Sequence, residues 1–432
     1  MGMLRFVSKR LVPLVALVVT GFAVACNGDG EPSHTATPGP SPTGTATAQR
    51  TTTPTPAVDE TPSSAAQPVP LEEGAPITEE GGYVIDVQSG RVWKVGEVPA
   101  SLWSPDGKTL MVQRCCGGEG TDLVDIEEGS AVRILSDDVA AAAWSPDGSR
   151  IVFSGHIGGT KGLYVINSDG SGLKLLSERG AYALEWSAKG DRIAFLDSPD
   201  HVYVLEVASG QTIDLADVGG YALAWSPNGT ELAFTNDSGL YVYGADAGEP
   251  RQVAVGPSEG PVLWSPDGSR IAFRFGPRVA LTRGIDAGNP KAGLRLFHVV
   301  EVDGSEEPRP LPPARYPSWS PDGTKIAFLS EGCITDDWDI YTVAPDGSSE
   351  VRLTNTPEAF KEGPFWSPTG ATVAFETSDD LMLVDAASGE LRTLASGGPR
   401  SGGPGIHLHD PPWSPDGRYI MFSAGGGHGV CD

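Results

Sequence analysis

The stretch Trp264-Ser265-Pro266-Asp267-Gly268 decides the fold, because this sequence or a close variant of it occurs eight times in the chain. Self-similarity with a period of roughly 40–50 residues is typical of β-propellers and other repeat arrays. The copies begin at Trp103, Trp144, Trp186, Trp225, Trp264, Trp319, Trp366 and Trp413. The repeats therefore fix the architecture, and the question of function moves to the loops between them.

The chemistry of this Trp phrase predicts a tight turn between two strands. Proline holds φ near −65°, as a type I turn requires, and glycine accepts the positive φ that follows. A short apolar run comes next, such as Ile271-Ala272-Phe273. Consecutive apolar residues suit a strand that is covered on both faces, and the frequent Pro and Gly argue against helices.

A second hairpin lies between successive Trp phrases. In one unit it consists of Leu163–Ile166, a polar turn and Leu173–Leu176. Each unit therefore has four strands, A to D, and the Trp phrase spans the turn between A and B.

The two ends of the repeat region are complementary halves of one unit. Residues 83–95 form a hairpin of the second kind without a Trp phrase before it, and residues 413–423 form a hairpin of the first kind. Pairing them closes a ring without an open edge. We therefore predict an all-β, eight-bladed propeller of four-stranded antiparallel blades, closed by the N- and C-terminal hairpins. Seven blades are the alternative if one unit is irregular.

These motifs resemble the TolB-type, WD40-like propeller repeats over about residues 80–432. The resemblance rests on the Trp phrase, the Ile-Ala-Phe run and the strand of the Leu-Tyr-Val type. Three copies depart from the pattern, at Ala188-Lys189, Asn228 and Thr369, but all keep the glycine. The resemblance implies a propeller and no particular activity, because function resides in sites grafted onto folds.

The first 75 residues predict export and anchoring. Residues 1–25 have a basic start and an apolar stretch, as in a signal peptide, and Ala23-Val24-Ala25-Cys26 resembles a bacterial lipobox. This resemblance implies acylation of Cys26 and an extracytoplasmic protein held at the cell membrane or envelope; an ordinary secretory signal is the alternative. Residues 26–75 are rich in Thr and Pro and predict a disordered tether. Residues 76–432 form the propeller.

The net charge of −26 argues against nucleic acid or an anionic membrane surface as a partner bound through bulk electrostatics. Much of the acid lies in turns, including the aspartates of the Trp phrases, where aspartate mainly supports the turn. We expect a monomer.

In a propeller, the B–C and D–A connections share one face, here called the loop face, and the A–B and C–D turns share the other, the turn face. We place the working surface on the loop face, because every cysteine of the domain falls in its loops. An exported protein allows disulfides. We expect Cys431 of the closing blade to pair with Cys333, which we assign to the neighbouring seventh blade. Cys115, Cys116 and free thiols are the alternatives.

Three histidines and an aspartate gather near the last Trp phrase. His407, His409 and Asp410 precede Trp413, and His428 follows it. Imidazoles and a carboxylate on one side of one blade could bind a divalent transition metal. The flexible, glycine-rich surroundings instead favour plain polar loops.

Other candidates for the binding face are Asp336 and Asp337, which stand beside Trp338, and Glu185, which could point a charge into the central channel. Trp338 could contact a protein or a sugar, or pack under its own loop. Gly256–Gly260 matches the G-x-S-x-G pattern of serine hydrolases, but it links a D strand to an A strand, so we interpret the match as accidental.

No constellation of acid, base and nucleophile is evident. The sequence therefore favours a non-enzymatic module that binds a protein, peptide or glycan through its loop face, without a cofactor. The alternative is a metal-assisted polysaccharide lyase or hydrolase that uses His407, His409 and His428.

Overall fold

The computed structural model describes the repeat region and a short segment before it. The described residues are 67–71, 76–96, 100–113, 120–137, 139–197, 201–215, 220–244, 248–275, 297–312, 314–331, 338–355, 361–377, 379–397 and 404–425. They contain strands and turns but no helix, and therefore no helix with the length and hydropathy needed to cross a membrane.

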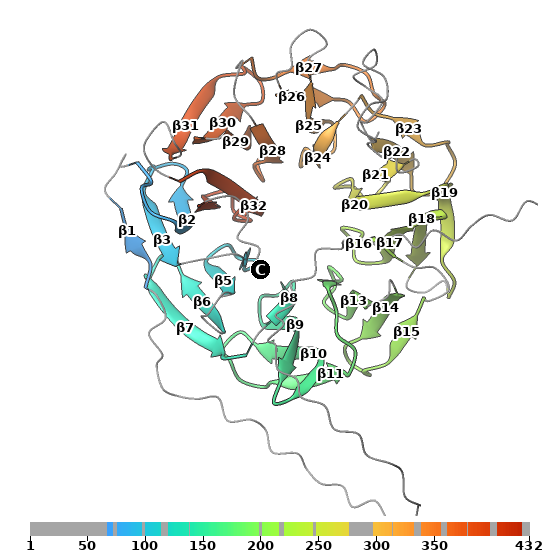
Figure 1. Ribbon diagram of the computed structural model, residues 1–432. Helices are drawn as coiled ribbons and strands as arrows, with labels where there is room; N and C mark the ends of the chain where they lie inside the picture. Colours follow the sequence, from blue (N-terminus) through green and yellow to red (C-terminus); the bar gives the residue numbers. More distant parts are fainter. Residues whose placement is uncertain are drawn as a thin grey trace, which may run out of the picture. The chain divides into compact units, whose positions relative to one another are not determined.

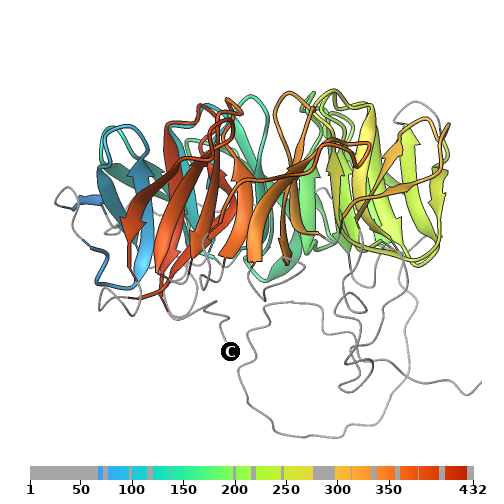
Figure 2. The same ribbon diagram turned by 90° about the horizontal axis from the view of Figure 1, so that it is seen from above.

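Eight antiparallel sheets form a ring, with strand A of each blade nearest the axis and strand D outermost (Figure 1). Figure 2 shows the strands of the blades running between the same two faces of the ring. The predicted all-β, eight-bladed propeller is confirmed, and the seven-bladed alternative is wrong.

Seven blades are each built from four consecutive strands. The first three contain β4 (Ala100–Trp103), β5 (Thr109–Gln113), β6 (Thr121–Asp125) and β7 (Ser130–Leu135); β8 (Val139–Trp144), β9 (Arg150–Ile157), β10 (Thr160–Asn167) and β11 (Lys174–Ser177); and β12 (Ala183–Trp186), β13 (Arg192–Asp197), β14 (His201–Glu206) and β15 (Thr212–Asp214). The fourth and fifth contain β16 (Ala222–Trp225), β17 (Glu231–Asn236), β18 (Gly239–Gly244) and β19 (Arg251–Val255); and β20 (Ser258–Trp264), β21 (Arg270–Phe275), β22 (Phe297–Glu301) and β23 (Arg309–Pro310). The sixth and seventh contain β24 (Arg315–Trp319), β25 (Ile326–Glu331), β26 (Trp338–Val343) and β27 (Val351–Arg352); and β28 (Lys361–Trp366), β29 (Thr372–Thr377), β30 (Asp380–Asp385) and β31 (Leu391–Ser396).

The closing blade joins the two ends of the repeat region. Its inner strands are β32 (Ile406–Trp413) and β33 (Tyr419–Ala424), and its outer strands are β2 (Gly81–Asp86) and β3 (Val92–Gly96). β2 pairs with β33 in an unbroken antiparallel register. A fifth strand that the sequence did not predict, β1 (Val69–Pro70), covers the outer edge of β3 and lies within the range assigned to the tether.

Eight apolar clusters fill the junctions between neighbouring blades. The run after each Trp phrase supplies their centre: Ile271, Ala272 and Phe273 are all fully buried, as a strand covered on both faces requires. In several blades the phenylalanine of this run stacks on a tyrosine of strand C, as Phe195 does on Tyr203 with ring centroids 5.2 Å apart. The core is therefore a ring of similar junctions.

One hydrogen bond is repeated at every junction. The indole N–H of each phrase tryptophan donates to a backbone carbonyl in strand A of the preceding blade, and the acceptor is always the residue just before that blade's own tryptophan. The eight Nε1–O pairs are Trp103–Pro412 (3.3 Å), Trp144–Leu102 (3.3 Å), Trp186–Ala143 (3.2 Å), Trp225–Glu185 (3.3 Å), Trp264–Ala224 (2.9 Å), Trp319–Leu263 (3.1 Å), Trp366–Ser318 (3.1 Å) and Trp413–Phe365 (3.1 Å).

The Trp-phrase turns also contact one another around the ring. Gly268 has a φ of 71°, which favours glycine, and a Cβ at this position would lie 3.7 Å from Pro227 of the preceding turn. Ser265 donates to Asp267 at 2.6 Å, and this hydrogen bond is the main reason why the pKa of Asp267 falls to about 2. The predicted turn chemistry is thus confirmed, and the acid serves the turn.

We expect Trp264→Phe to lower the free energy of unfolding by about 1–3 kcal/mol, because it leaves the partly buried Ala224 carbonyl without its indole donor. Denaturant unfolding measures this loss. Trp93→Phe is the matched control, since the Trp93 indole N–H makes no hydrogen bond with a described residue. Equal losses in both variants would show that ring volume matters and the hydrogen bond does not.

A chain that begins at residue 97 lacks β1 to β3 and leaves β33 as an open edge. We expect it to unfold at lower temperature than a chain that begins at residue 67, and to self-associate through that edge. Size-exclusion chromatography and thermal melting compare the two. A monomeric, equally stable short chain would contradict closure by strand pairing.

Candidate functional site

The loop face is where strands A begin, strands B end and strands C begin. Tyr182 and Tyr221 each stand immediately before an innermost strand, β12 and β16, and Tyr316 is the second residue of β24. We call these three residues the tyrosine rim. They lie around the axis of the ring at its loop face, because strands A are the innermost strands (Figure 1).

The tyrosine rim holds all the strongly exposed aromatic side chains of the described residues. Tyr182, Tyr221 and Tyr316 are 46%, 36% and 51% exposed. The other large apolar side chains with such exposure are aliphatic and lie on outer strands: Val69, Val132, Leu175, Ile213, Val255 and Val351. Among the described residues, exposed aromatic surface is thus found at the starts of the innermost strands of the third, fourth and sixth blades.

Backbone geometry positions these rings. The Tyr182 N–H donates to Leu196 O at 3.1 Å, and the Tyr182 hydroxyl reaches Gly220 O of the next blade at 3.3 Å. Tyr316 has a φ of 51°, beside an irregularity in the β24–β25 register. A non-glycine residue in this region costs of order 1–3 kcal/mol, and bulges commonly re-aim side chains near sites. The fold therefore maintains the exposure of Tyr316 at a cost.

A cation lies beside the rim. The guanidinium of Arg315 is 4.3 Å from the centre of the Trp338 ring, which is a cation–π contact. Trp338 is half-buried, so part of the ring packs and part is accessible. The next residue, Asp339, is buried and bonded to Arg352 and to the Thr354 hydroxyl. This network holds the start of β26 in place.

The blade assignment of this segment needs a correction. We expected the loop with Cys333 and Trp338 in the seventh blade, next to the closing blade. Its flanking strands, β25 and β26, belong to the sixth blade, and β28–β31 stand between that blade and the closing blade. The Trp phrase that starts at Trp319 is the sixth in order, so the error was one of counting.

The candidate cysteines lie outside the described residues. This holds for Cys26, Cys115, Cys116, Cys333 and Cys431, and also for Asp336, Asp337 and His428. The acylation and the disulfide pairing stay predictions.

His407 lies within a strand, where the sequence suggested a polar loop. It is the second residue of β32, and its Nδ1 is 3.2 Å from Oε1 of Glu376 on β29. Glu376 is 4% exposed and also accepts the Leu408 N–H. Glu376 was not identified from the sequence as a candidate site residue. The signal that could have found it is a carboxylate directly after the apolar run Val373-Ala374-Phe375, where a buried strand continues. The pair joins the seventh and closing blades on the loop face.

The metal hypothesis rests on residues that the structure describes only in part. His409 and Asp410 belong to β32, but their side chains fall outside the description. Within the part of the chain that is described, no group of three or more His, Cys, Asp or Glu side chains could hold a metal ion. The metal site stays a prediction.

Glu185 occupies a position that is otherwise apolar or small. It is the residue before Trp186, and the corresponding residues are Pro412, Leu102, Ala143, Ala224, Leu263, Ser318 and Phe365. Its carboxylate accepts the Trp225 backbone N–H at 3.0 Å, so it reaches sideways to the next blade. Burial raises the pKa of Glu185 to about 7, and the Trp225 N–H, which favours the ionised form, opposes this rise. Glu185 therefore titrates near neutral pH in the wall of innermost strands.

The G-x-S-x-G match is accidental, as expected. Ser258 begins β20, is fully buried and donates its hydroxyl to Arg274 O at 2.8 Å. A nucleophile of this class must instead be exposed between a strand and a helix.

We expect Glu185→Gln to reduce the pH dependence of stability. The folded pKa of Glu185 lies above its unfolded value, so its contribution is complete below about pH 4.5 and is lost as the pH rises through about 7. Relative to the parent, the variant should gain about 1–3 kcal/mol of unfolding free energy between pH 5 and pH 8. Denaturant unfolding at both pH values measures this gain. If the difference in unfolding free energy between variant and parent is the same at pH 5 and pH 8, the Glu185 carboxylate is solvated by water in the folded protein.

Comparison with known proteins agrees with the fold. No protein-family profile matches the chain. Over 150 residues it is 29% identical to "Uncharacterized peptidase YuxL" of Bacillus subtilis (strain 168), covering 25% of this chain and 21% of that protein. The match thus spans about a fifth of the length of this curated relative.

Two solved structures are similar. The C-terminal WD40 domain of Sif2 has a TM-score of 0.53 at 16% identity and covers 82% of this chain and 99% of that one. TolB from Acinetobacter baumannii has a TM-score of 0.35 at 16% identity and covers 62% of each chain. Identities this low show the fold alone. The chain is an eight-bladed β-propeller, similar in fold to a WD40 domain.

Proposed function

We propose that this propeller is a binding module that captures a protein, peptide or glycan through the loop face, with the tyrosine rim as the centre of contact. The observation that carries the proposal is the gathering of the exposed aromatic side chains at the starts of the innermost strands. Tyrosine and tryptophan are enriched where proteins meet partners, because each offers a large rigid surface with a polar edge.

The rim is supported by the sheets of the ring. The backbone N–H groups of Tyr182 and Tyr221 donate hydrogen bonds to strands of their own blades, so the sheets set the Cα positions of both residues. Binding of a partner should therefore cost little conformational entropy in the propeller, because the backbone of the rim is already ordered. Arg315 over Trp338 adds a cation and a second aromatic surface on the sixth blade.

We further propose that the module acts outside the cytoplasmic membrane, anchored through an acylated Cys26 and a tether that ends near β1. The support is the sequence pattern of residues 1–75. Disulfides among the loop-face cysteines would then stabilise the binding loops.

A capture experiment tests the binding role. The protein from residue 67 onward is immobilised and exposed to the envelope fraction of its source cells and to a glycan array. We expect a retained partner, and Tyr182→Ala/Tyr221→Ala/Tyr316→Ala should weaken its binding about tenfold or more, as loss of central aromatic contacts does.

The matched control is Val132→Ala/Val255→Ala/Val351→Ala, which removes exposed apolar side chains of the outer strands. It should bind like the parent. Undiminished capture by the tyrosine variant would exclude the tyrosine rim as the contact surface. Turnover of a substrate, with no partner retained, would contradict the binding role and indicate an enzyme.

A further inference from the structure

A cavity of about 350 Å³ lies at the seam where the ring closes. Its walls come from three parts of the chain: the turn between β2 and β3, the start of β33, and the turn after β6 in the first blade. These are A–B and C–D turns, so the cavity opens on the turn face, opposite the tyrosine rim. Its volume falls at the lower end of the range for small-molecule sites, roughly 300–1,000 Å³.

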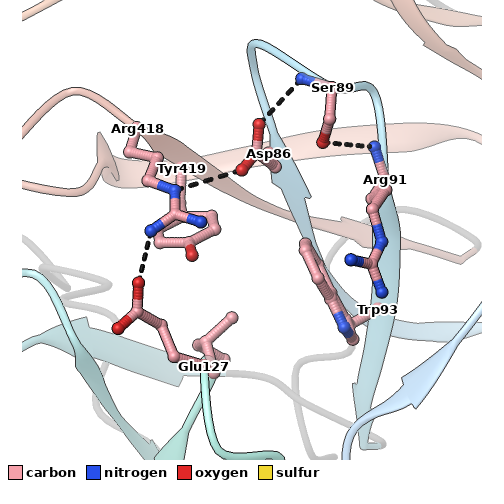
Figure 3. Close-up of a pocket in the computed structure, with 8 residues that line it drawn as sticks. Asp86, Ser89, Arg91, Trp93, Glu127, Arg418 and Tyr419 are labelled. Carbon is pink, nitrogen blue, oxygen red and sulfur yellow. Dashed lines mark hydrogen bonds and ion pairs between the residues drawn. The ribbon is translucent and has the colours of Figure 1, made fainter.

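One side of the cavity is electrostatically satisfied. Arg418 donates from Nε to Asp86 at 3.1 Å and from Nη1 to Glu127, and its guanidinium lies 4.7 Å from the centre of the Tyr419 ring. Two carboxylates thus share this one cation. Figure 3 shows these groups on one wall.

The opposite side of the cavity holds a cation, Arg91, that has no carboxylate partner among the described residues. The guanidinium of Arg91 lies 5.2 Å from the centre of the Trp93 ring and makes no ion pair with any residue that the structure describes. In Figure 3, Arg91 and Trp93 face Arg418 and Tyr419 across the opening. The contact with Trp93 places the guanidinium beside the opening, and its N–H groups suit a planar, two-oxygen acceptor.

Tyr419 supplies a second donor. The residue is 2% exposed, and its ring stacks on Trp103 with the ring centroids 5.9 Å apart. Its hydroxyl makes no hydrogen bond with a described residue and is not fully buried, so it can donate to a ligand in the cavity. Burial raises the pKa of Tyr419, so the phenol keeps its proton and remains a donor at neutral pH.

We propose that this seam cavity binds a small organic carboxylate, which accepts hydrogen bonds from the Arg91 guanidinium and the Tyr419 hydroxyl. The ligand is an anion because the two lining groups without a partner among the described residues are a cation and a hydroxyl donor. It is small because the cavity admits no more. Since its contacts span the N-terminal hairpin and β33, the ligand also holds the closing blade together.

A second cavity on this face lacks these features. It measures about 170 Å³ and lies between the fifth and sixth blades. There, Arg309 is paired with Glu306, and Arg270 is paired with Glu301 at 2.7 Å. Both arginines of this cavity are therefore already in ion pairs with glutamates, and neither is available to an anionic ligand. Arg309→Gln serves as the matched control.

Calorimetric and thermal-shift titration of the purified full-length protein tests the proposal. The probes are acetate, benzoate and benzamide, the last having the shape of benzoate without its charge. We expect an acid to bind and to raise the melting temperature, and benzamide to bind about tenfold or more weakly. Binding of neither acid, or equal binding of benzoate and benzamide, would overturn the proposal.

Variants locate the site. Arg91→Gln should weaken benzoate about ten- to a hundredfold, the usual effect of losing a charged hydrogen bond, and Tyr419→Phe should weaken it several-fold. Arg309→Gln should bind like the parent. Melting without ligand verifies that each variant folds. Benzoate binding that survives Arg91→Gln and Tyr419→Phe, or that is lost in Arg309→Gln, would place the carboxylate elsewhere.

Discussion

The structure depends on one contact repeated around the ring, the hydrogen bond from the indole N–H of a phrase tryptophan to a backbone carbonyl of the preceding blade. An indole N–H that packs between blades needs an acceptor, and supplying one at every junction constrains the distance and relative height of neighbouring strands A. With N–O distances of 2.9–3.3 Å at the eight junctions, the blades share one geometry. The stacked turns and apolar clusters then follow from that spacing.

The sequence revealed this architecture because the constraint is local and repeated. Trp, Ser, Pro, Asp and Gly each have a role within five residues, so eight copies could be read without knowledge of distant contacts. The closing blade was also predictable, because residues 83–95 and 413–423 are complementary halves. By contrast, β1 is two residues of a Thr- and Pro-rich stretch, and only the outer edge of β3 makes Val69 and Pro70 a strand.

The site was less predictable, since exposure and partnership are properties of three-dimensional neighbours. Tyr182 and Tyr221 stand four residues before Trp186 and Trp225, so their equivalence could have been noticed, but nothing in the sequence says that this position faces outward. Glu185 was predicted as a charge that could point into the central channel; its carboxylate accepts a hydrogen bond from the next blade. The His407–Glu376 pair joins residues 31 apart in the chain, and no motif links them.

The two faces of the ring differ in how their polar groups are used. On the turn face, the aspartates of the Trp phrases accept hydrogen bonds from neighbouring hydroxyl and backbone donors. Arg91, beside the seam, is a cation that makes no ion pair with a described residue. On the loop face, aromatic rings are exposed and polar pairs such as His407 and Glu376 connect blades. A capture surface and a small-ligand site can therefore coexist without sharing a residue.

The closure between β2 and β33 is made entirely of contacts that other blades make within one stretch of chain. The point at which the polypeptide is interrupted is thus arbitrary with respect to the ring. Joining the present ends by a linker and opening the chain between β13 and β14 would preserve every blade, every indole bond and their rotational order. The fold is in this sense a closed cycle, because the order of the blades around the ring does not depend on where the chain is interrupted.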